Sequence, residues 1–380
     1  MTFDFRLQNI MTFDFRLLLL LFWTGLSAQE IDSAVEETDT ISEIISETPP
    51  PRYIAPYAKL DSIARTVRYD GNLEKATYEL TKSYSSEIEK TRAIFAWVTA
   101  NIAYDYKSYN KNKRTDFPKC KGKDDCAAKF IKWEADYLNN VLRKGKGVCD
   151  GYARVFKKMC GFAGIRCSVV SGWSKQYINQ VGRMGALNHA WNVVIIEEKP
   201  YYLDATWAAG YCTRNEKGEL DAFHRSYNDY YWLTPEDRFL RNHFPKDTIW
   251  PKTSKADKIV YRDQPYINNH YLSSIDILSP ESGVIKVKMC EFIKFKFDLR
   301  YVVRKMQVNT NLYKNPRAWV LENGEKVLDG NALKKQKYVD LQDSDLFYEF
   351  EYEVLDRNLR FIEVLFDYNV ALKFKVEVVD

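Results

Sequence analysis

Gly147-Val148-Cys149-Asp150-Gly151-Tyr152-Ala153-Arg154-Val155-Phe156 places a single cysteine at the predicted start of a helix. Apolar residues recur at helical spacing from Asp150 to about Cys160, and Gly161 and Gly164 indicate where the helix ends. A thiol is nucleophilic as the thiolate, which a helix N-terminus favours. We therefore predict that Cys149 is a nucleophile; a buried structural cysteine is the alternative, and the flanking glycines argue against it.

Two later segments offer partners for this cysteine. His189 to Ile196 and Lys199 to Trp207 are predicted strands that meet at Glu197-Glu198. A two-residue turn there pairs Asp204 with Trp191 and makes Asp204 a diagonal neighbour of His189 on the same face, about 7–8 Å away. A carboxylate inside an apolar strand needs a partner. The sequence thus predicts a triad in which Cys149 is the nucleophile, His189 the acid and base, and Asp204 the residue that orients the histidine.

The N-terminal region has the pattern of an export signal followed by a linker. Arg16, the apolar run Leu17–Trp23 and the small residues up to Ala28 are typical of a signal peptide, with its true start perhaps at Met11, where the heptapeptide of Met1 repeats. The run is too short for a stable membrane span. Residues 29–52 form an acidic linker that ends in three prolines. We predict an exported protein, periplasmic or secreted.

Charge and composition exclude some classes of function. The net charge of +4 divides into zero for the signal, −7 for residues 30–51 and +11 for residues 52–380. That basicity is scattered and accompanies no nucleic-acid-binding motif, so no nucleic-acid partner is expected. The 26 Tyr, 21 Phe and 9 Trp supply ample core material for two domains in 380 residues.

The seven cysteines and four histidines indicate no metal centre. His224, His243 and His270 lack ligand-like spacing with cysteines, so we predict no zinc site. Cys120 and Cys126 close a short loop and are the best candidates for a disulfide in an exported chain. The triad chemistry requires no organic cofactor.

The remaining pattern predicts two domains. Helices are expected within residues 57–82, after the capping box Ser86 to Glu89, and from Phe130 to Arg143. A strand is expected at Cys167 to Gly172, in addition to the two strands described above. Together these elements predict an α+β domain with an antiparallel sheet over residues 53–252. Residues 265–380 alternate apolar with polar in six or seven short strands, which predicts an all-β, immunoglobulin-like sandwich.

Several of these segments resemble the transglutaminase-like superfamily of papain-fold thiol enzymes, and within it the branch of kyphoscoliosis peptidase and the cytokinesis-type transglutaminase-like proteins. The resemblance covers about residues 85–250 and is carried by these stretches: Trp97 to Asp105, Gly147 to Ala153, Asn188 to Asn192, Leu203 to Gly210, and Tyr230 to Glu236 with His243-Phe244-Pro245. It implies the same roles for Cys149, His189 and Asp204. The family's side-chain donor to the oxyanion has no obvious counterpart; Trp133 and Tyr104 are candidates, and the Cys149 N–H is a safer one.

The resemblance also sets the alternatives, because the family includes cross-linkers, proteases, deamidases and members that only bind. We expect an exported cysteine-nucleophile acyl-transfer enzyme acting on protein or peptide amides. A non-catalytic peptide- or protein-binding module that uses the same cleft is the alternative, and processing of cell-wall peptides is a third hypothesis. The acyl acceptor, amine or water, and the oligomeric state are open.

Overall fold

The computed structural model describes residues 57–112, 115–120, 123–247, 249–250, 253–322, 325–341 and 347–380. The predicted signal peptide and acidic linker lie outside these residues and stay predictions. Within the described part, helices come first, an antiparallel sheet follows, and the C-terminal third is all-β. This confirms the predicted fold class, helices with an antiparallel sheet followed by an all-β region.

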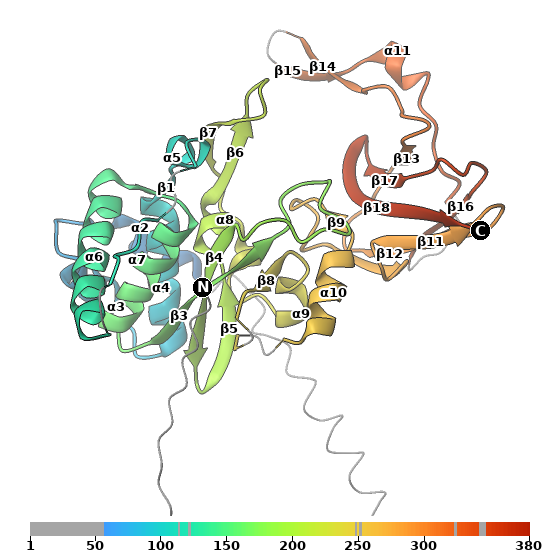
Figure 1. Ribbon diagram of the computed structural model, residues 1–380. Helices are drawn as coiled ribbons and strands as arrows, with labels where there is room; N and C mark the ends of the chain where they lie inside the picture. Colours follow the sequence, from blue (N-terminus) through green and yellow to red (C-terminus); the bar gives the residue numbers. More distant parts are fainter. Residues whose placement is uncertain are drawn as a thin grey trace, which may run out of the picture. The chain divides into compact units, whose positions relative to one another are not determined.

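Five helices lie on one side of the central sheet (Figure 1). Ser86 begins the central one, accepting a hydrogen bond from the Glu89 N–H, as the predicted capping box requires. Residues Thr91 to Thr99 of that helix are all buried in the core. The helices are α2 (Ala58–Thr66), α3 (Leu73–Thr81), α4 (Glu87–Asn101), α6 (Lys123–Lys144) and α7 (Cys149–Phe162), and the short α5 (Tyr106–Asn110) follows α4.

The central sheet has the strand order β5-β4-β3-β8, with every neighbouring pair antiparallel. Its strands are β3 (Arg166–Ser174), β4 (His189–Ile196), β5 (Lys199–Leu203) and β8 (His243–Pro245). Asn192 pairs with Leu203 and Ile196 with Lys199, which is the register predicted from a two-residue turn. Helix α7 packs across β3 and β4. The start of that helix and the start of β4 are thereby brought to the same end of the domain.

The predicted strand Lys199 to Trp207 is too long. Strand β5 ends at Leu203, and α8 (Ala205–Ala209) begins at once. The Asp204 side chain accepts hydrogen bonds from the N–H groups of Thr206 and Trp207 and so caps this helix. Asp204 therefore caps a helix in addition to its predicted contact with His189, because the residue stands just after the strand and not inside it.

The rest of the N-terminal domain surrounds the sheet. A two-residue parallel pair joins β1 (Ala103–Tyr104) to β2 (Lys146–Gly147). The other elements are the ribbon of β6 (Gly210–Arg214) and β7 (Leu220–Arg225), the 3-10 turn η2 (Asp229–Tyr231), α9 (Glu236–Phe239) and α10 (Lys255–Asp263).

The C-terminal region contains two main sheets that share one apolar core. One has the order β10-β12-β16; the other has the order β11-β18-β17-β13, with β9 paired to β18, and Phe295, Phe350, Val364 and Phe374 meet between them. The parallel pairing of β11 with β18 was not predicted. The elements are β9 (Tyr266–Ile267), β10 (Ile275–Ser279), β11 (Val284–Lys288), β12 (Phe292–Leu299), β13 (Met306–Thr310), β14 (Trp319–Glu322), β15 (Glu325–Leu328), α11 (Gly330–Leu333), β16 (Tyr348–Glu353), β17 (Phe361–Phe366) and β18 (Asn369–Val379).

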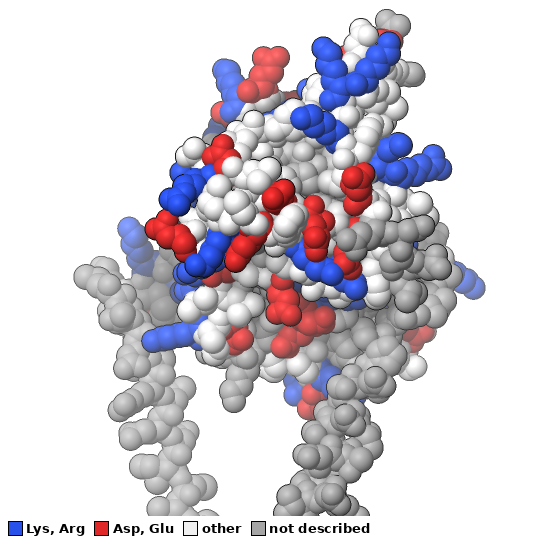
Figure 2. Space-filling view, turned by 90° about the vertical axis from the view of Figure 1, so that its right-hand side faces the viewer, with Lys and Arg blue, Asp and Glu red and all other residues white. Residues whose placement is uncertain are grey.

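The predicted disulfide between Cys120 and Cys126 is present. Cys149 is among the free cysteines, as expected. No helix in the described ranges is long and apolar enough to cross a membrane. On the face drawn in Figure 2, basic and acidic side chains are mixed and do not separate by sign, in keeping with the scattered charge of the sequence.

Candidate active site

Cys149 occupies the first turn of α7. Val148 is the N-cap, and its carbonyl accepts hydrogen bonds from the N–H groups of Gly151 and Tyr152. The thiol-bearing residue is half-buried and free of any disulfide. Among the hydrogen bonds of the described residues, none uses the backbone N–H of Cys149. The positive end of the helix dipole and an available N–H donor thus meet at the sulfur.

The β1·β2 pair places Tyr104 beside this helix start. Tyr104 pairs with Gly147, two residues before Cys149, and the Asp105 N–H donates to the Gly147 carbonyl. Burial and the neighbouring Cys149 raise the pKa of Tyr104 far above its usual range. Tyr104 therefore keeps its proton at physiological pH and is a hydrogen-bond donor close to the thiol.

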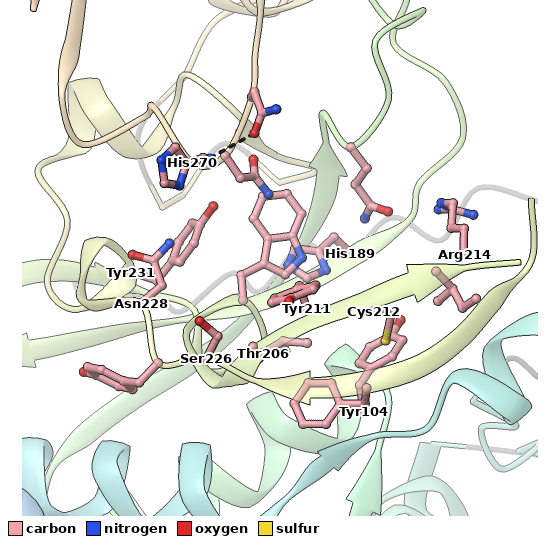
Figure 3. A pocket seen from close by; sticks show the side chains of 18 of the residues that line it. Tyr104, His189, Thr206, Tyr211, Cys212, Arg214, Ser226, Asn228, Tyr231 and His270 are labelled. Carbon is pink, nitrogen blue, oxygen red and sulfur yellow. Dashed lines mark hydrogen bonds between the residues drawn. The ribbon is translucent and has the colours of Figure 1, made fainter. Parts of the chain in front are cut away.

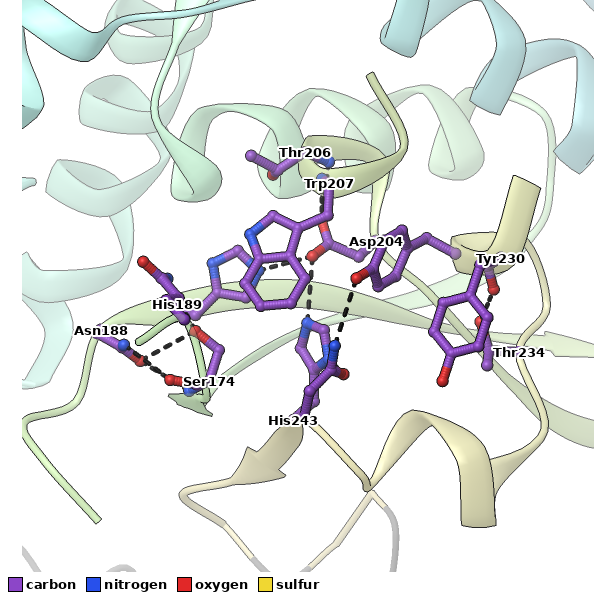
Figure 4. A network of polar contacts seen from close by, with 12 residues as sticks. Ser174, Asn188, His189, Asp204, Thr206, Trp207, Tyr230, Thr234 and His243 are labelled. Carbon is purple, nitrogen blue, oxygen red and sulfur yellow. Dashed lines mark hydrogen bonds and ion pairs between the residues drawn. The ribbon is translucent and has the colours of Figure 1, made fainter. Parts of the chain in front are cut away.

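His189 and Asp204 are in direct contact, as Figure 4 shows. His189 Nε2 donates to Asp204 Oδ2 over 2.6 Å, and both side chains are buried. Cys149 lies close enough to His189 to raise the pKa of the imidazole. Because Nε2 donates its hydrogen bond to Asp204, Nδ1 is the ring nitrogen that remains to interact with the thiol. The three residues predicted from the sequence therefore lie together in the order Cys149, His189, Asp204.

Electrostatics favour a charged histidine. Burial opposes the imidazolium, but the Asp204 carboxylate and Cys149 outweigh burial and raise the pKa of His189 to about 10. Burial likewise disfavours the Asp204 anion, yet the charge of His189 and hydrogen bonds from His189 and His243 hold its pKa below the usual range. An imidazolium beside a thiol stabilises the thiolate, as nucleophilic catalysis by cysteine requires.

A second histidine, which sequence reasoning did not place in the site, contacts the same carboxylate. His243 Nε2 lies 3.2 Å from Asp204 Oδ2, and the ring is fully buried. The motif His243-Phe244-Pro245 contributed to the family resemblance but did not predict this contact. Strand β8 pairs with β3, which is distant in sequence, and such a pairing cannot be recognised from the local pattern. Burial and the nearby His189 charge lower the pKa of His243 to about 4, against the pull of Asp204.

His189, Asp204 and His243 are also the three side chains that could hold a metal ion. The 2.6 Å contact between His189 and Asp204 is a direct hydrogen bond, with no room for an ion between the atoms. The other carboxylate oxygen already accepts two backbone N–H groups. The arrangement fits a hydrogen-bonded triad better than a metal centre.

A cavity of about 660 Å³ opens at His189 (Figure 3). The Trp207 ring stacks on the His189 ring at 4.9 Å and forms one wall. Further walls come from β1, from the β6–β7 ribbon and from the segment that precedes the C-terminal strands, with Tyr104, Tyr211, Cys212, Ser226, Asn228 and His270 in the lining. The cavity is bounded mainly by aromatic, amide and hydroxyl groups.

Trp133 is not in this cavity. It belongs to α6, where its ring packs against Phe130 and Tyr137 and lies 5.0 Å from the Arg154 guanidinium. Arg154 in turn holds Asp150 through both carboxylate oxygens. Trp133 therefore supports the nucleophile helix from behind, and Tyr104 is the better of the two predicted oxyanion candidates.

Part of the chain is similar to a known protein family. Residues 74–209 match the family model described as the transglutaminase-like superfamily. Kyphoscoliosis peptidase of Mus musculus is 29% identical over 238 residues, and that of Homo sapiens is 28% identical over 239 residues; each alignment covers 60% of this chain and 32% of the relative. Hillarin of Drosophila melanogaster is 24% identical over 181 residues, which are 45% of this chain and 20% of that protein.

The chain thus spans about a third of the length of the first two relatives. The family match includes the segments that carry Cys149, His189 and Asp204, and it ends before His243. Residues 74–209 of this chain are therefore similar to the domain that defines the transglutaminase-like superfamily.

Proposed function

We propose that the protein is an exported thiol acyl-transfer enzyme that acts on protein or peptide amides through Cys149, His189 and Asp204. The observation that carries the proposal is the buried 2.6 Å hydrogen bond from His189 to Asp204, with Cys149 at a helix N-terminus close to the same imidazole. Thiol, imidazole and carboxylate in this order are the parts that nucleophilic catalysis by cysteine needs.

The chemistry proceeds in two halves. The Cys149 thiolate adds to the amide carbonyl carbon, and the carbonyl oxygen becomes an oxyanion. When the C–N bond breaks, His189 gives its proton to the departing ammonia or amine, and a thioester on Cys149 remains. His189, now neutral, then takes a proton from the acceptor as it attacks the thioester, and the thiolate leaves. An amine acceptor gives cross-linking, whereas water gives deamidation or proteolysis.

Two donors near the sulfur support stabilisation of the oxyanion. The free N–H of Cys149 is one, and the Tyr104 hydroxyl, held beside it by the β1·β2 pair, is the other. Tyr104→Phe should slow the acylation burst with p-nitrophenyl acetate about tenfold to a hundredfold, because one oxyanion donor is lost. Alkylation of Cys149 by iodoacetamide forms no oxyanion and should change little. Equal bursts in the two proteins would contradict this role.

The lining of the cavity supports a polypeptide substrate. Apart from His189, its two charged side chains already have partners: Arg214 donates to the Tyr177 hydroxyl, and Asp229 accepts from Arg92. What remains free for a substrate is aromatic surface together with amide and hydroxyl groups, which suit peptide bonds and uncharged side chains. The disulfide between Cys120 and Cys126 supports export to an oxidising compartment.

Limited alkylation with iodoacetamide tests the proposal. The wild-type chain, Cys149→Ala and His189→Ala would be labelled from pH 4 to 9 and the site of labelling read by peptide mass. We expect rapid labelling at Cys149 below the normal thiol range, lost in Cys149→Ala and slowed in His189→Ala. Amine incorporation and peptide cleavage screens would then identify the acceptor. If Cys149 reacts like an ordinary thiol, a non-catalytic binding module becomes the better interpretation.

A further inference from the structure

His243 is a buried polar residue for which the two-step chemistry above has no use. It stands at the first position of the edge strand β8, opposite Ser174, and its side chain is fully buried. Phe239 stacks on its ring at 4.2 Å, and the Trp207 ring lies 4.7 Å away. A side chain held between two aromatic rings has little freedom to turn, so its contact with Asp204 has a fixed direction (Figure 4).

The positions of the protons follow from the partners. Asp204 Oδ2 only accepts hydrogen bonds, so the His243 nitrogen 3.2 Å away, Nε2, must carry a proton. A neutral imidazole has one N–H, which leaves Nδ1 as an acceptor. The Asn242 side chain lies with Oδ1 2.6 Å from Nδ1 and with Nδ2 donating to the Tyr231 hydroxyl. A neutral His243 protonated on Nε2 requires this amide to be turned by 180°, so that its N–H points to Nδ1 and its oxygen accepts from the Tyr231 hydroxyl.

A cationic His243 would donate from both nitrogens, but the surroundings oppose it. Burial and the neighbouring His189 charge both disfavour a second imidazolium, although Asp204 favours one, and the pKa of His243 falls to about 4. The titratable groups that contact the ring are Asp204, His189 and Tyr231. The neutral form is therefore the one present near pH 7.

The Asp204 carboxylate consequently has two donors on each oxygen. Oδ1 accepts from the N–H groups of Thr206 and Trp207, and Oδ2 accepts from His189 and His243. A carboxylate offers about four acceptor positions, so this set saturates it. Without His243, Oδ2 would have His189 as its one donor, and less would prevent the carboxylate from turning about its side-chain bond.

We propose that His243 is a positioning residue for the His189–Asp204 pair, and that the directed chain Tyr231–Asn242–His243 aims Asp204 Oδ2 at His189. The inference rests on the proposed function and adds a fourth side chain to it. Residues that hold a metal-binding histidine in place through a hydrogen bond typically change activity about tenfold to a hundredfold when removed, and we expect an effect of this size here.

The test uses the full chain and two readouts. Imidazole ¹H–¹⁵N correlation spectra should show His243 neutral and protonated on Nε2. His243→Phe keeps the ring that stacks on Phe239 and removes the donor; it should slow Cys149 alkylation near pH 6 at least about tenfold and alter its pH profile. His243→Gln places an amide N–H near the position of Nε2 and should restore most of the rate. His224→Phe, a histidine outside the network, is the matched control.

Protonation of His243 on Nδ1 or on both nitrogens would overturn the proposal, and so would a folded His243→Phe protein with the wild-type alkylation profile. If the His243→Phe protein does not fold, the alkylation rate of the Asn242→Asp variant tests the same role. An aspartate only accepts and draws the proton to Nδ1, so Cys149 alkylation should slow, and an unchanged rate refutes the role. An ordinary thiol profile in the wild type would instead refute the proposed function, while the spectrum still tests the proton positions.

Discussion

At the scale of single residues, Asp204 uses one carboxylate oxygen to cap a helix and the other to bind histidine side chains. Oδ1 caps α8, and Oδ2 binds His189 and His243. A substitution that keeps one role and removes the other can therefore separate local stability from the electrostatics of the site. Asparagine is such a substitution, because it is as good an N-cap as aspartate but carries no charge.

Asp204→Asn should retain α8 and lose the anion that raises the pKa of His189 to about 10. The imidazolium then titrates at lower pH, and rapid alkylation of Cys149 should be lost near neutral pH. Asp204→Ala should show the same chemical loss and a further drop of about 1 kcal/mol in the free energy of unfolding, because the cap is also removed. Urea unfolding and iodoacetamide kinetics measure the two effects; equal stability of the two variants would argue against the capping role.

The sequence predicted these residues to different degrees for physical reasons. His189 and Asp204 are joined by a hairpin, so the register of one short turn is enough to bring them together. Cys149 is marked by glycines and a helix start. His243 is joined to the site by an edge strand that pairs with β3, about seventy residues away along the chain, and no local periodicity reports such a pairing.

At the scale of elements, the turn between β4 and β5 has an unfavourable sequence. Glu197 and Glu198 have φ angles of 48° and 66°, the left-handed pair of a type I′ turn. Asn-Gly suits this conformation far better than Glu-Glu. The hairpin register is therefore set by the apolar strands and not by the turn residues.

Replacing both residues, Glu197→Asn with Glu198→Gly, should stabilise the protein by about 0.5–1 kcal/mol, because the strain of two left-handed residues is relieved. Glu198→Ala is the control: it removes the same Arg166 ion pair but keeps a residue with a Cβ at positive φ. The free energy of unfolding in urea checks the prediction, and a double variant no more stable than the control would contradict it.

Gly172 allows two strands and a tryptophan to approach closely. A Cβ at this position would lie 2.1 Å from the Phe244 carbonyl oxygen and 2.2 Å from Trp191 Cη2. Gly172→Ala should therefore force β8 away from β3 and cost about 2–4 kcal/mol, with slower Cys149 alkylation because His243 moves with β8. Gly161→Ala, whose Cβ would meet no atom within 4 Å, should be neutral or slightly stabilising. Similar stabilities for the two variants would show that β8 adjusts freely.

Element types were predicted well where periodicity is long and poorly where it is short. Strand β4 and helix α4 follow clear patterns and have the expected bounds within a residue or so. Helix α8 has five residues, too few for a helical period, so Asp204 to Trp207 looked like the end of a strand. Strands β10 and β13 were missed because Ile275 to Ser279 and Met306 to Thr310 are flanked by segments without alternation.

At the scale of the whole described chain, Lys175 connects the end of β3 to the segment that leads into the C-terminal strands. Its ammonium is buried and donates to the carbonyls of Arg262 and Gln264, while Gly182 N–H also donates to the Arg262 carbonyl. Its backbone N–H donates to the Asn242 carbonyl, next to His243. Lys175 therefore contacts both the residue that precedes His243 and the segment that leads into the C-terminal strands.

Burial lowers the pKa of Lys175 to about 7, against the pull of Asp263. Between about pH 7 and 10.5 the unfolded chain holds this proton and the folded chain releases it, so folding stability should rise with pH there. Relative to Lys175→Met, the wild type should gain about 2 kcal/mol of unfolding free energy from pH 7 to 9. A difference between the two proteins that stays constant across this range would show that the lysine remains charged.

The reach of β8 also bears on how a shorter form of this protein would behave. The family match ends at residue 209, and all three triad side chains precede that point. The last donor to the Asp204 carboxylate comes only with residue 243, and the strand that carries it is held by β3 and by the N–H of Lys175, which follows β3. A chain truncated at residue 209 would lack the hydrogen bond from His243 to the buried Asp204 carboxylate. A chain that keeps all four donors to the Asp204 carboxylate must therefore extend past the family match, at least to the strand that carries His243.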